Sequence, residues 1–446
     1  MSRFATMVAM VTTVAMVPSF RWSPGGGPLA AQTVSSPRGL LRRADSAYAA
    51  GDRRRSAELY GRVLAEDPDQ SRAVFRLAQI AATRQERLAL YTRYTQLEPR
   101  DPWGFLALGD AYHKAGRERS ALGAYRAAAR LAPSEPDVVA RLGPQRHRVS
   151  PALEPIASYQ RDSDANAVRR VGLRADLQAG EMTRLGAQVQ HASVSGAGEA
   201  TVDEALARIG TRGPGLRVDL SAGAAHLASP LTPSAFITPS ADGRLQWRAP
   251  SGGPAVELRA QRLVLGASPL LVANRVTRNE ARFGLDFPAG PIRLRGTGRV
   301  GMVEALGESA NRRLQGDGMI VLPIGDVKEL SLQYHRLGYQ RASLAGYFAP
   351  ARVETIEGGT YLEFGERVVL AMDLGAGAQR LATQGAGVGP WRLALRSYAY
   401  VALPLGPTTQ LRLEGEAYKA PFAPEGAVTA ENWRYGSLSL ALRWAL

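Results

Sequence analysis

The chain has 446 residues, a formal net charge of +15 at neutral pH and no cysteine. Its length allows two domains, and the lack of cysteine excludes a disulfide framework, a thiolate metal site and a lipid anchor on cysteine. The positive charge is carried by Arg far more than by Lys. It comes without a basic helix or a known nucleic-acid-binding motif, so we expect no nucleic-acid partner.

Residues 1–31 have the pattern of a secretory signal peptide. Arg3 supplies a positive start, residues 4–17 are mostly apolar but too few to span a bilayer as a helix, and residues 29–31 form a small-residue cleavage site. The alternative is an N-terminal anchor that is not cleaved. No later segment holds the ~20 uninterrupted apolar residues of a membrane helix, so entry into a membrane would require a β-barrel.

Residues 37–143 are predicted to be helical and repetitive. In the clearest unit, from Pro102 to Pro133, the small and aromatic residues fall where a tetratricopeptide (TPR) repeat of about 34 residues places them. These residues are Phe105, Leu108, Gly109, Tyr112, Gly116, Ala121, Tyr125 and Ala128. Earlier units end at Pro68 and Pro99, so we predict about three repeats, the minimum for a stable stack.

The repeat pattern predicts a concave surface that binds a partner, either a periplasmic protein or a glycan. By that pattern the surface is lined by Trp103, Leu106, Asp110 and His113. The alternative is that the repeats only space or cap the domain that follows.

Gly143-Pro144 is expected to end the helical region, although residues 137–142 could begin one more helix. From Leu153 onward the period of the apolar residues changes from 3.6 to 2. Residues 150–446 contain many such alternating runs, separated by turn signals such as residues 316–318. This pattern predicts an antiparallel transmembrane β-barrel of about 16 strands. A water-soluble β-sandwich also alternates and is the alternative.

The polar faces of these strands carry charged residues that we expect to line the barrel lumen. The candidates are Arg170, Arg174, Arg217, Arg259, Arg293, Arg295, Arg392, Arg396, Arg412 and Glu414. In one interpretation they form a salt-bridged lumen that closes the barrel by itself. In the other they line a wet path for a polar or anionic solute.

We expect no catalytic or metal site. The five histidines, at positions 113, 147, 191, 226 and 335, are scattered without metal-ligand spacing, and neither a Gly-x-Ser-x-Gly elbow nor a phosphate loop occurs. Residues 296–301 fit the letters of a dinucleotide loop but lie within an alternating strand. A His226–Ser229 pair could resemble a barrel esterase, yet a lone His beside a loop Ser is more often structural. The chain is predicted to be non-enzymatic and to need no cofactor.

One stretch resembles a known family. Gly346, Tyr347, Phe348 and Pro350, in the run Gly-Tyr-Phe-Ala-Pro, follow a Tyr-containing strand and the run Asn-Arg-Arg-Leu at residues 311–314. This order resembles the segment of bacterial outer-membrane barrels that follow TPR repeats. Within that group, the stretch is similar to the C-terminal barrel of the cellulose-synthase outer-membrane subunit (operon protein C) and to the smaller YaiO-type barrels.

The resemblance implies an N-terminal TPR solenoid in the periplasm and a barrel in the outer membrane lipid of a Gram-negative-type bacterium. In that family the repeats dock periplasmic partners or polymer, and the barrel is the exit pore. The chain is therefore expected to serve export or assembly of a secreted polysaccharide. Its repeat array is far shorter than in a cellulose exporter, which favours the YaiO-like barrels. The alternative is a non-transporting scaffold barrel whose TPR groove docks periplasmic partners.

Overall fold

The structure is a computed structural model that describes residues 37–232, 234–249, 252–325, 328–365, 368–406, 408–420 and 433–446. The predicted signal peptide, residues 1–31, lies outside these ranges. The chain divides into two compact units, residues 1–73 and residues 74–446.

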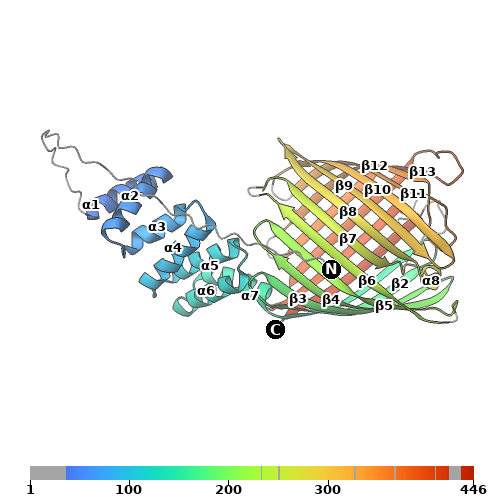
Figure 1. The fold of residues 1–446 in the computed structure, drawn as a ribbon, viewed down its shortest axis with the longest axis horizontal. Helices are drawn as coiled ribbons and strands as arrows, with labels where there is room; N and C mark the ends of the chain where they lie inside the picture. Colours follow the sequence, from blue (N-terminus) through green and yellow to red (C-terminus); the bar gives the residue numbers. More distant parts are fainter. Residues whose placement is uncertain are drawn as a thin grey trace, which may run out of the picture. The chain divides into compact units, whose positions relative to one another are not determined.

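Helices come first along the chain (Figure 1). They are α1 (Pro37–Ala49), α2 (Arg53–Glu66), α3 (Ser71–Ile80), α4 (Arg84–Leu97), α5 (Pro102–Lys114), α6 (Glu118–Leu131) and α7 (Pro136–Val149). Side-chain caps determine several of the starts. Asp52 accepts a hydrogen bond from the Arg55 amide before α2, and Thr83 accepts one from the Glu86 amide before α4. Each cap satisfies an amide that has no partner within its helix.

In the first unit, α1 and α2 pack around a fully buried Tyr60. Leu40 and Val63 on the same two helices are also buried, and the Tyr60 hydroxyl donates a hydrogen bond of 2.7 Å to Asp45. A buried Tyr needs such a partner for its hydroxyl.

In the second unit, α5 and α6 form a close helical hairpin. A Cβ atom added at Gly109 would lie 2.4 Å from Cε1 of Tyr125, so only glycine lets the Tyr125 ring lie on α5 at this point. Ala121, Ala128 and Val138 complete the same apolar core. The small and aromatic positions that suggested a repeat unit are thus the ones at which the helices touch.

Helix α7 departs from the sequence prediction. It begins at Pro136 and runs through Gly143-Pro144 to Val149, so the prediction that Gly143-Pro144 ends the helical region is wrong. A proline inside a helix removes one backbone hydrogen bond. Here Val138, Gln145 and Val149 are buried, and their packing compensates for that loss. Within the described ranges, no helix has the length and apolar character needed to cross a bilayer.

The strands form one closed antiparallel barrel (Figure 1), and the described residues contribute sixteen of them. They are β1 (Ala152–Asp162), β2 (Ala167–Gln178), β3 (Thr183–Gly196), β4 (Gly198–Arg212), β5 (Leu216–Ala228), β6 (Phe236–Arg248), β7 (Ala255–Val264), β8 (Thr277–Ala289), β9 (Ile292–Ala305), β10 (Glu308–Pro323), β11 (Lys328–Tyr339), β12 (Arg352–Phe364), β13 (Val369–Ala382), β14 (Arg392–Pro404), β15 (Thr409–Ala420) and β16 (Trp433–Ala445). A short helix, α8 (Pro269–Ala273), lies between β7 and β8. Each strand pairs with its neighbours in the chain, and β1 pairs with β16.

Closure gives each strand an outer and an inner face. The outer face is apolar and exposed, as at Val171, Leu258, Leu332 and Leu438. An exposed apolar band around a closed barrel is the surface of a membrane-spanning protein. The inner face carries the charged side chains that alternate with this band. Residues 296–301 lie within β9, which confirms that they are strand residues and not a dinucleotide loop.

We predict that Gly109→Ala lowers the thermal stability of the helical region by about 1–3 kcal/mol, because the new methyl group overlaps Tyr125. The matched control is Gly123→Ala on α6, where a Cβ meets nothing within 4 Å. This control should raise stability by up to about 1 kcal/mol through helix propensity. Thermal melting followed by circular dichroism at 222 nm measures both. Equal melting temperatures would show that the α5–α6 contact does not need glycine.

Candidate functional site

The barrel interior is the candidate functional site. We call proximal the strand ends that carry the turns at residues 179–182 and 213–215, where β1 also begins. We call distal the opposite ends, which carry α8 and the segment 340–351 between β11 and β12.

Ion pairs on the inner face join both neighbouring and next-nearest strands. Glu154 on β1 is buried and lies 2.7 Å from Arg174 on β2 and 3.3 Å from Arg412 on β15. Glu280 on β8 lies 2.6 Å from Arg313 on β10, and their side chains are only 1% and 5% exposed. Buried charges of this kind are stable only when they are paired. The interior charges therefore hold next-nearest strands together.

The predicted lumen residues all lie on this inner face, opposite the exposed apolar side chains. Most have a carboxylate partner. Arg217 pairs with Asp219, Arg259 with Asp242, Arg293 with Asp286, Arg295 with Asp286 and Glu329, and Arg396 with Glu357 and Asp373. Arg170, Arg392 and Glu414 share the face by their strand positions. Pairing reduces the net positive field that the sequence suggested for the lumen.

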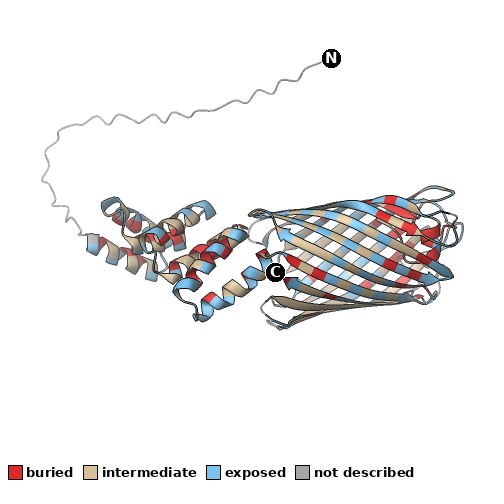
Figure 2. Ribbon diagram, turned by 90° about the horizontal axis from the view of Figure 1, so that it is seen from below, coloured by how far each residue is buried: buried red, intermediate tan, exposed pale blue. Residues whose placement is uncertain are grey.

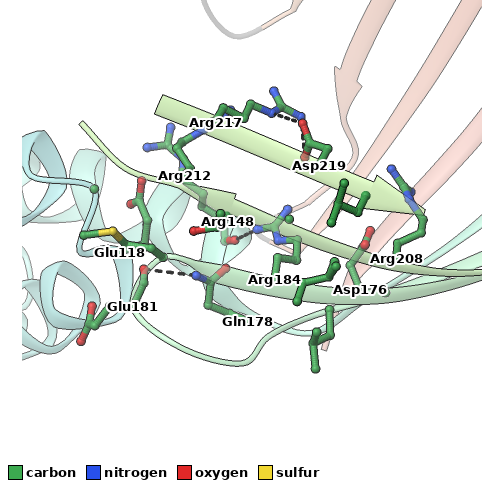
Figure 3. A pocket seen from close by; sticks show the side chains of 18 residues that line it. Glu118, Arg148, Asp176, Gln178, Glu181, Arg184, Arg208, Arg212, Arg217 and Asp219 are labelled. Carbon is green, nitrogen blue, oxygen red and sulfur yellow. Dashed lines mark hydrogen bonds and ion pairs between the residues drawn. The ribbon is translucent and has the colours of Figure 1, made fainter. Parts of the chain in front are cut away.

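Arginines gather at the proximal ends of β2 to β5 (Figure 3). Arg184, Arg208, Arg212 and Arg217 line a small hollow of about 170 Å³ there, together with acidic side chains such as Asp176. Arg217 donates a hydrogen bond of 2.6 Å to Asp219.

The distal end contains an apolar plug built on α8. Val272 of α8 packs with inner-face residues of β2 to β5, among them Val168 and Leu227. Its neighbour Leu271 packs with inner-face residues of β9, β11 and β12, among them Val303 and Leu337. The two adjacent residues belong to clusters on two separate parts of the barrel wall, so α8 lies inside the distal end of the lumen.

The segment with the family-like motif forms the second half of the plug. Tyr347 and Ala349 are buried in the same cluster as Leu271. Gly346 has φ +95°, and a Cβ there would lie 2.8 Å from Cγ of Leu270, so glycine permits both the backbone conformation and the contact with α8. The Asn274 side chain also donates a hydrogen bond of 3.1 Å to the Ala345 carbonyl.

The second resemblance motif anchors this segment. The side-chain amide of Asn311 donates to the Arg341 carbonyl at 2.8 Å and to the Tyr347 hydroxyl at 3.2 Å, and the Asn311 carbonyl accepts from the Arg341 amide at 3.1 Å. The two motifs, far apart in sequence, are thus parts of one structure. Figure 2 shows buried residues concentrated at the barrel end opposite the C-terminus, where this plug lies.

Aromatic side chains line the inner face of β12 and of β14 to β16. Tyr361 lies near the proximal end and Tyr398 near the middle of its strand, whereas Tyr418 and Tyr435 lie near the distal end. The ring centroids of Tyr418 and Tyr435 are 6.0 Å apart, and Trp433 stacks on Tyr435 at 5.5 Å. Sequence reasoning missed this line, because the residues belong to different strands and each looks like an ordinary strand tyrosine.

The predicted TPR groove is only partly open. Trp103 is 45% exposed, but Leu106 is only 5% exposed and packs in the core with Val138 of α7. Leu106 cannot line an open surface, and its prediction as a groove residue is wrong. Asp110 accepts hydrogen bonds from Tyr125 and from Arg141 of α7. The reason is that α7 packs over the stripe that the sequence assigned to the groove.

His113 belongs to a polar cluster between α5, α6 and α7. Its Nδ1 lies 3.0 Å from a carboxylate oxygen of Glu118, and the buried Gln145 donates to the same oxygen at 2.7 Å. Burial alone would raise the pKa of Glu118, but the hydrogen bonds from Gln145 and His113 outweigh it and lower this pKa below its ordinary value. Burial and a hydrogen bond to Asp110 raise the pKa of Tyr125.

The other histidines have partners too. His335 bonds to Asp317 in the lumen, and both His191 and His226 lie beside Asp203. The hydroxyl of Ser229 donates to the Glu199 carbonyl, so the His226–Ser229 pair weighed in the sequence analysis does not form. Within the described ranges, no group of three His, Cys, Asp or Glu residues could hold a metal ion.

Comparison with solved structures shows the fold that this chain shares with known proteins. No family model and no curated protein matches the chain. The solved structure of a bacterial polysaccharide outer membrane secretin matches with a TM-score of 0.50 and 10% identity, over 67% of this chain and 99% of that one. The barrel is of the outer-membrane type.

Two further solved structures are less similar. Pseudomonas aeruginosa OccK5 (OpdH) has a TM-score of 0.38 and 9% identity, over 67% of this chain and 98% of that one. MamA from Desulfovibrio magneticus RS-1 has a TM-score of 0.25 and 21% identity, over 26% of this chain and 67% of that one.

We predict that Leu271→Asp opens the plug. Leu271 is fully buried, and an unpaired carboxylate in its place costs several kcal/mol, which favours expulsion of α8 from the lumen. Conductance in planar bilayers should rise severalfold. The control is Leu344→Asp, on a side chain that is 94% exposed. If both variants conduct like the parent protein, α8 does not restrict the lumen.

We predict that the α5–α7 helices lose stability in acid through Glu118. Because its folded-state pKa is lowered, its contribution is full above the ordinary pKa and is lost as pH falls through the lowered value. Glu118→Gln should destabilise the helices at neutral pH by about 1.5–3 kcal/mol and should flatten the acid limb of the stability curve. Melting at 222 nm across pH measures this. An unchanged acid limb would assign the effect to other carboxylates.

Proposed function

We propose that this protein is an outer-membrane conduit for export of a secreted polysaccharide, with its helical region in the periplasm. The line of interior aromatic residues carries the proposal. Sugars present flat apolar faces as well as hydroxyl groups. Tyrosine rings cover the apolar faces and offer a polar tip, and paired Arg and Glu side chains exchange hydrogen bonds with the hydroxyls.

The positions of the aromatic residues fit a path along the wall. Tyr361 lies near the proximal end and Tyr435 near the distal end, so the line follows the direction in which a polymer would move. The two clusters that contain Leu271 and Val272 of α8 are centred on β2 to β5 and β9 to β12, away from Tyr418 and Tyr435. A chain of sugars could therefore bind along one wall while the plug occupies the other.

Two further observations support a polysaccharide as the transported molecule. The solved structure with the same barrel fold is described as a polysaccharide outer membrane secretin. The plug contains one of the two motifs that resemble the barrels of exopolysaccharide export subunits, Gly346 to Pro350, and Asn311 of the other motif, on β10, anchors it. Because the motif residues build and anchor the plug, we propose that the plug is the gate that these barrels share.

In this proposal the helices dock a periplasmic protein or the polymer itself. We interpret α1 to α7 as a short TPR array, in which Trp103 is an exposed aromatic anchor and Asp110 and His113 are held in internal hydrogen bonds. Exposed tryptophans are frequent energetic centres of binding surfaces.

The plug also favours a second candidate, a non-transporting scaffold barrel. The apolar plug at the distal end narrows the lumen there. In the scaffold, α8 would remain in place and the aromatic line would only pack the wall. The two candidates differ in whether soluble sugars enter the lumen.

Conductance block by sugars tests the proposal. With α8 displaced by Leu271→Asp, a neutral β-1,4-glucan hexamer or a polyuronate oligomer should interrupt the current. Tyr398→Ala and Tyr418→Ala should each weaken block about fivefold, since one stacking contact is worth about 1 kcal/mol.

Tyr159→Ala is the matched control, because Tyr159 lies on the outer face of β1 and is 42% exposed. It should leave the block constant unchanged. Open channels that neither oligomer blocks would exclude the aromatic line as a sugar path and would leave the scaffold as the function.

A further inference from the structure

Polar side chains occupy much of the distal part of the outer face, and three of them form a cluster. They are His191 on β3, Asp203 on β4 and His226 on β5, and the strand register places His191 opposite Asp203 and Asp203 opposite His226. They alternate with inward-pointing neighbours and share their face with exposed apolar residues such as Val189 and Ile209. Polar and charged groups beside apolar neighbours on such a surface are costly unless they are paired, and these three are in contact with one another.

A serine completes the cluster. Ser193 lies two residues after His191 on the same strand and therefore on the same face. Its hydroxyl oxygen lies 3.1 Å from Nε2 of His191, and Nδ1 of the same imidazole lies 2.7 Å from Oδ1 of Asp203. The carboxylate thus holds one ring nitrogen as the N–H donor and leaves the other free to accept the serine proton. This is the relationship of a Ser–His–Asp triad.

We propose that Ser193, His191 and Asp203 form a catalytic triad on the bilayer-facing surface and cleave carboxylic esters of membrane lipids. The sequence predicts a non-enzymatic chain because it contains no contiguous nucleophile motif. The triad lies on two antiparallel strands, where no contiguous motif exists to be found. The hydrolytic activity is independent of the export function, since the triad is on the outer face and the aromatic line is on the inner face.

Other polar groups of the barrel lack this order. On the outer face, Arg262 pairs with Glu304, and Arg380 pairs with Glu354, without a histidine between carboxylate and hydroxyl. In the lumen, Thr297 donates to Asp317 itself, and His335 contacts the same carboxylate. There the hydroxyl is bonded to the acid and not to the imidazole, so no base is poised on it.

An apolar groove adjoins His191 and Asp203 of the triad, and Ser193 lies outside its lining. It has a volume of about 730 Å³ and is lined by the outer-face residues Val171, Leu173, Val189, Ala205, Ala224 and Ile237, together with His191, Asp203 and His226. Ile237 is 68% exposed. Because this surface faces the bilayer, the occupant we assign to the groove is an acyl chain of a membrane lipid, with its ester at the histidines.

The chemistry balances with water as the only co-reactant. Ser193 Oγ attacks the ester carbonyl carbon while its proton passes to Nε2 of His191. The bond from that carbon to the alcohol oxygen breaks, and the alcohol leaves with the proton from Nε2. Water then attacks the acyl carbon while its proton passes to Nε2 of His191. The bond from that carbon to Ser193 Oγ breaks, Oγ takes the proton back from Nε2, and the fatty acid leaves. Asp203 keeps its charge and stabilises the imidazolium.

The triad lies in the distal part of its strands, since His191 is closer to the distal end of β3 at Gly196 than to the start at Thr183. If the helices are periplasmic, as proposed, this part faces the outer leaflet. The substrate class is therefore an acyl ester of either a glycerophospholipid or an acylated diglucosamine lipid. The choice of leaflet rests on the proposed orientation, whereas the esterase chemistry does not.

The test uses the full chain folded in detergent, with heat-modifiability as the measure of folding for every variant. A fluorophosphonate probe should label the parent protein covalently at Ser193. Vesicles of diacyl phosphatidylethanolamine and vesicles containing hexa-acylated diglucosamine lipid separate the two sources by release of fatty acid. Ser193→Ala should abolish labelling and lower release at least about a hundredfold, and His191→Gln should do the same.

Ser195→Ala is the matched control, because Ser195 lies on the same face of β3 and contacts only the Ala167 carbonyl, at 3.5 Å, among the hydrogen bonds of the described residues. It should keep both labelling and release. Two results would overturn the triad: a folded parent protein that is neither labelled nor active on either vesicle, or release that Ser193→Ala and His191→Gln leave unchanged. Loss of sugar block with retained esterase activity would reject the export function alone.

Discussion

The closure of the sheet between β1 and β16 is the constraint on which the structure depends. An apolar bilayer core cannot satisfy an exposed backbone amide or carbonyl, so a sheet that crosses it must have no free edge. Pairing from Ala152 with Ala445 to Asp162 with Tyr435 removes that edge. Closure then divides the side chains of every strand between lipid and lumen, and each proposed activity uses one of these two environments.

The lumen shows how a charged interior can also be closed. Along most of its length Arg side chains pair with carboxylates across the curved wall, as Arg313 does with Glu280. At the distal end the inner face becomes apolar, and α8 with residues 340–351 fills the space through contacts of Leu271, Val272 and Tyr347. The plug is held by apolar packing and a few hydrogen bonds, so its displacement would leave no buried charge without a partner. A plug held by salt bridges would lose its charge partners on displacement and would be less suited to act as a gate.

The outer face of the barrel has fewer polar groups than the lumen. Its membrane-facing band is mostly leucine, valine and alanine. The cluster of His191, Ser193 and Asp203 lies beside this band, in the distal part of the outer face. In the lumen the same residue types would be ordinary members of a polar network. In this cluster the carboxylate contacts the imidazole, and the imidazole contacts the hydroxyl. An apolar groove lies beside them. The inner face of β3 packs against the plug through Ala192 and Val194, whereas its outer face carries this cluster.

The sequence by itself determined the strands, their approximate number and the face on which Arg174, Arg293 or Arg396 lies, because alternation with a period of two is a local property. It also located the helices and the glycine at position 109. Tertiary structure decided which residues meet. Leu106 became core because α7 packs over it, and α7 passes Pro144 because Gln145 and Val149 find buried sites. His191 meets Asp203 through the register of one hairpin, and α8 lies inside the lumen because the closed sheet brings β2 to β5 opposite β9 to β12. Such contacts depend on three-dimensional proximity, which no local period encodes.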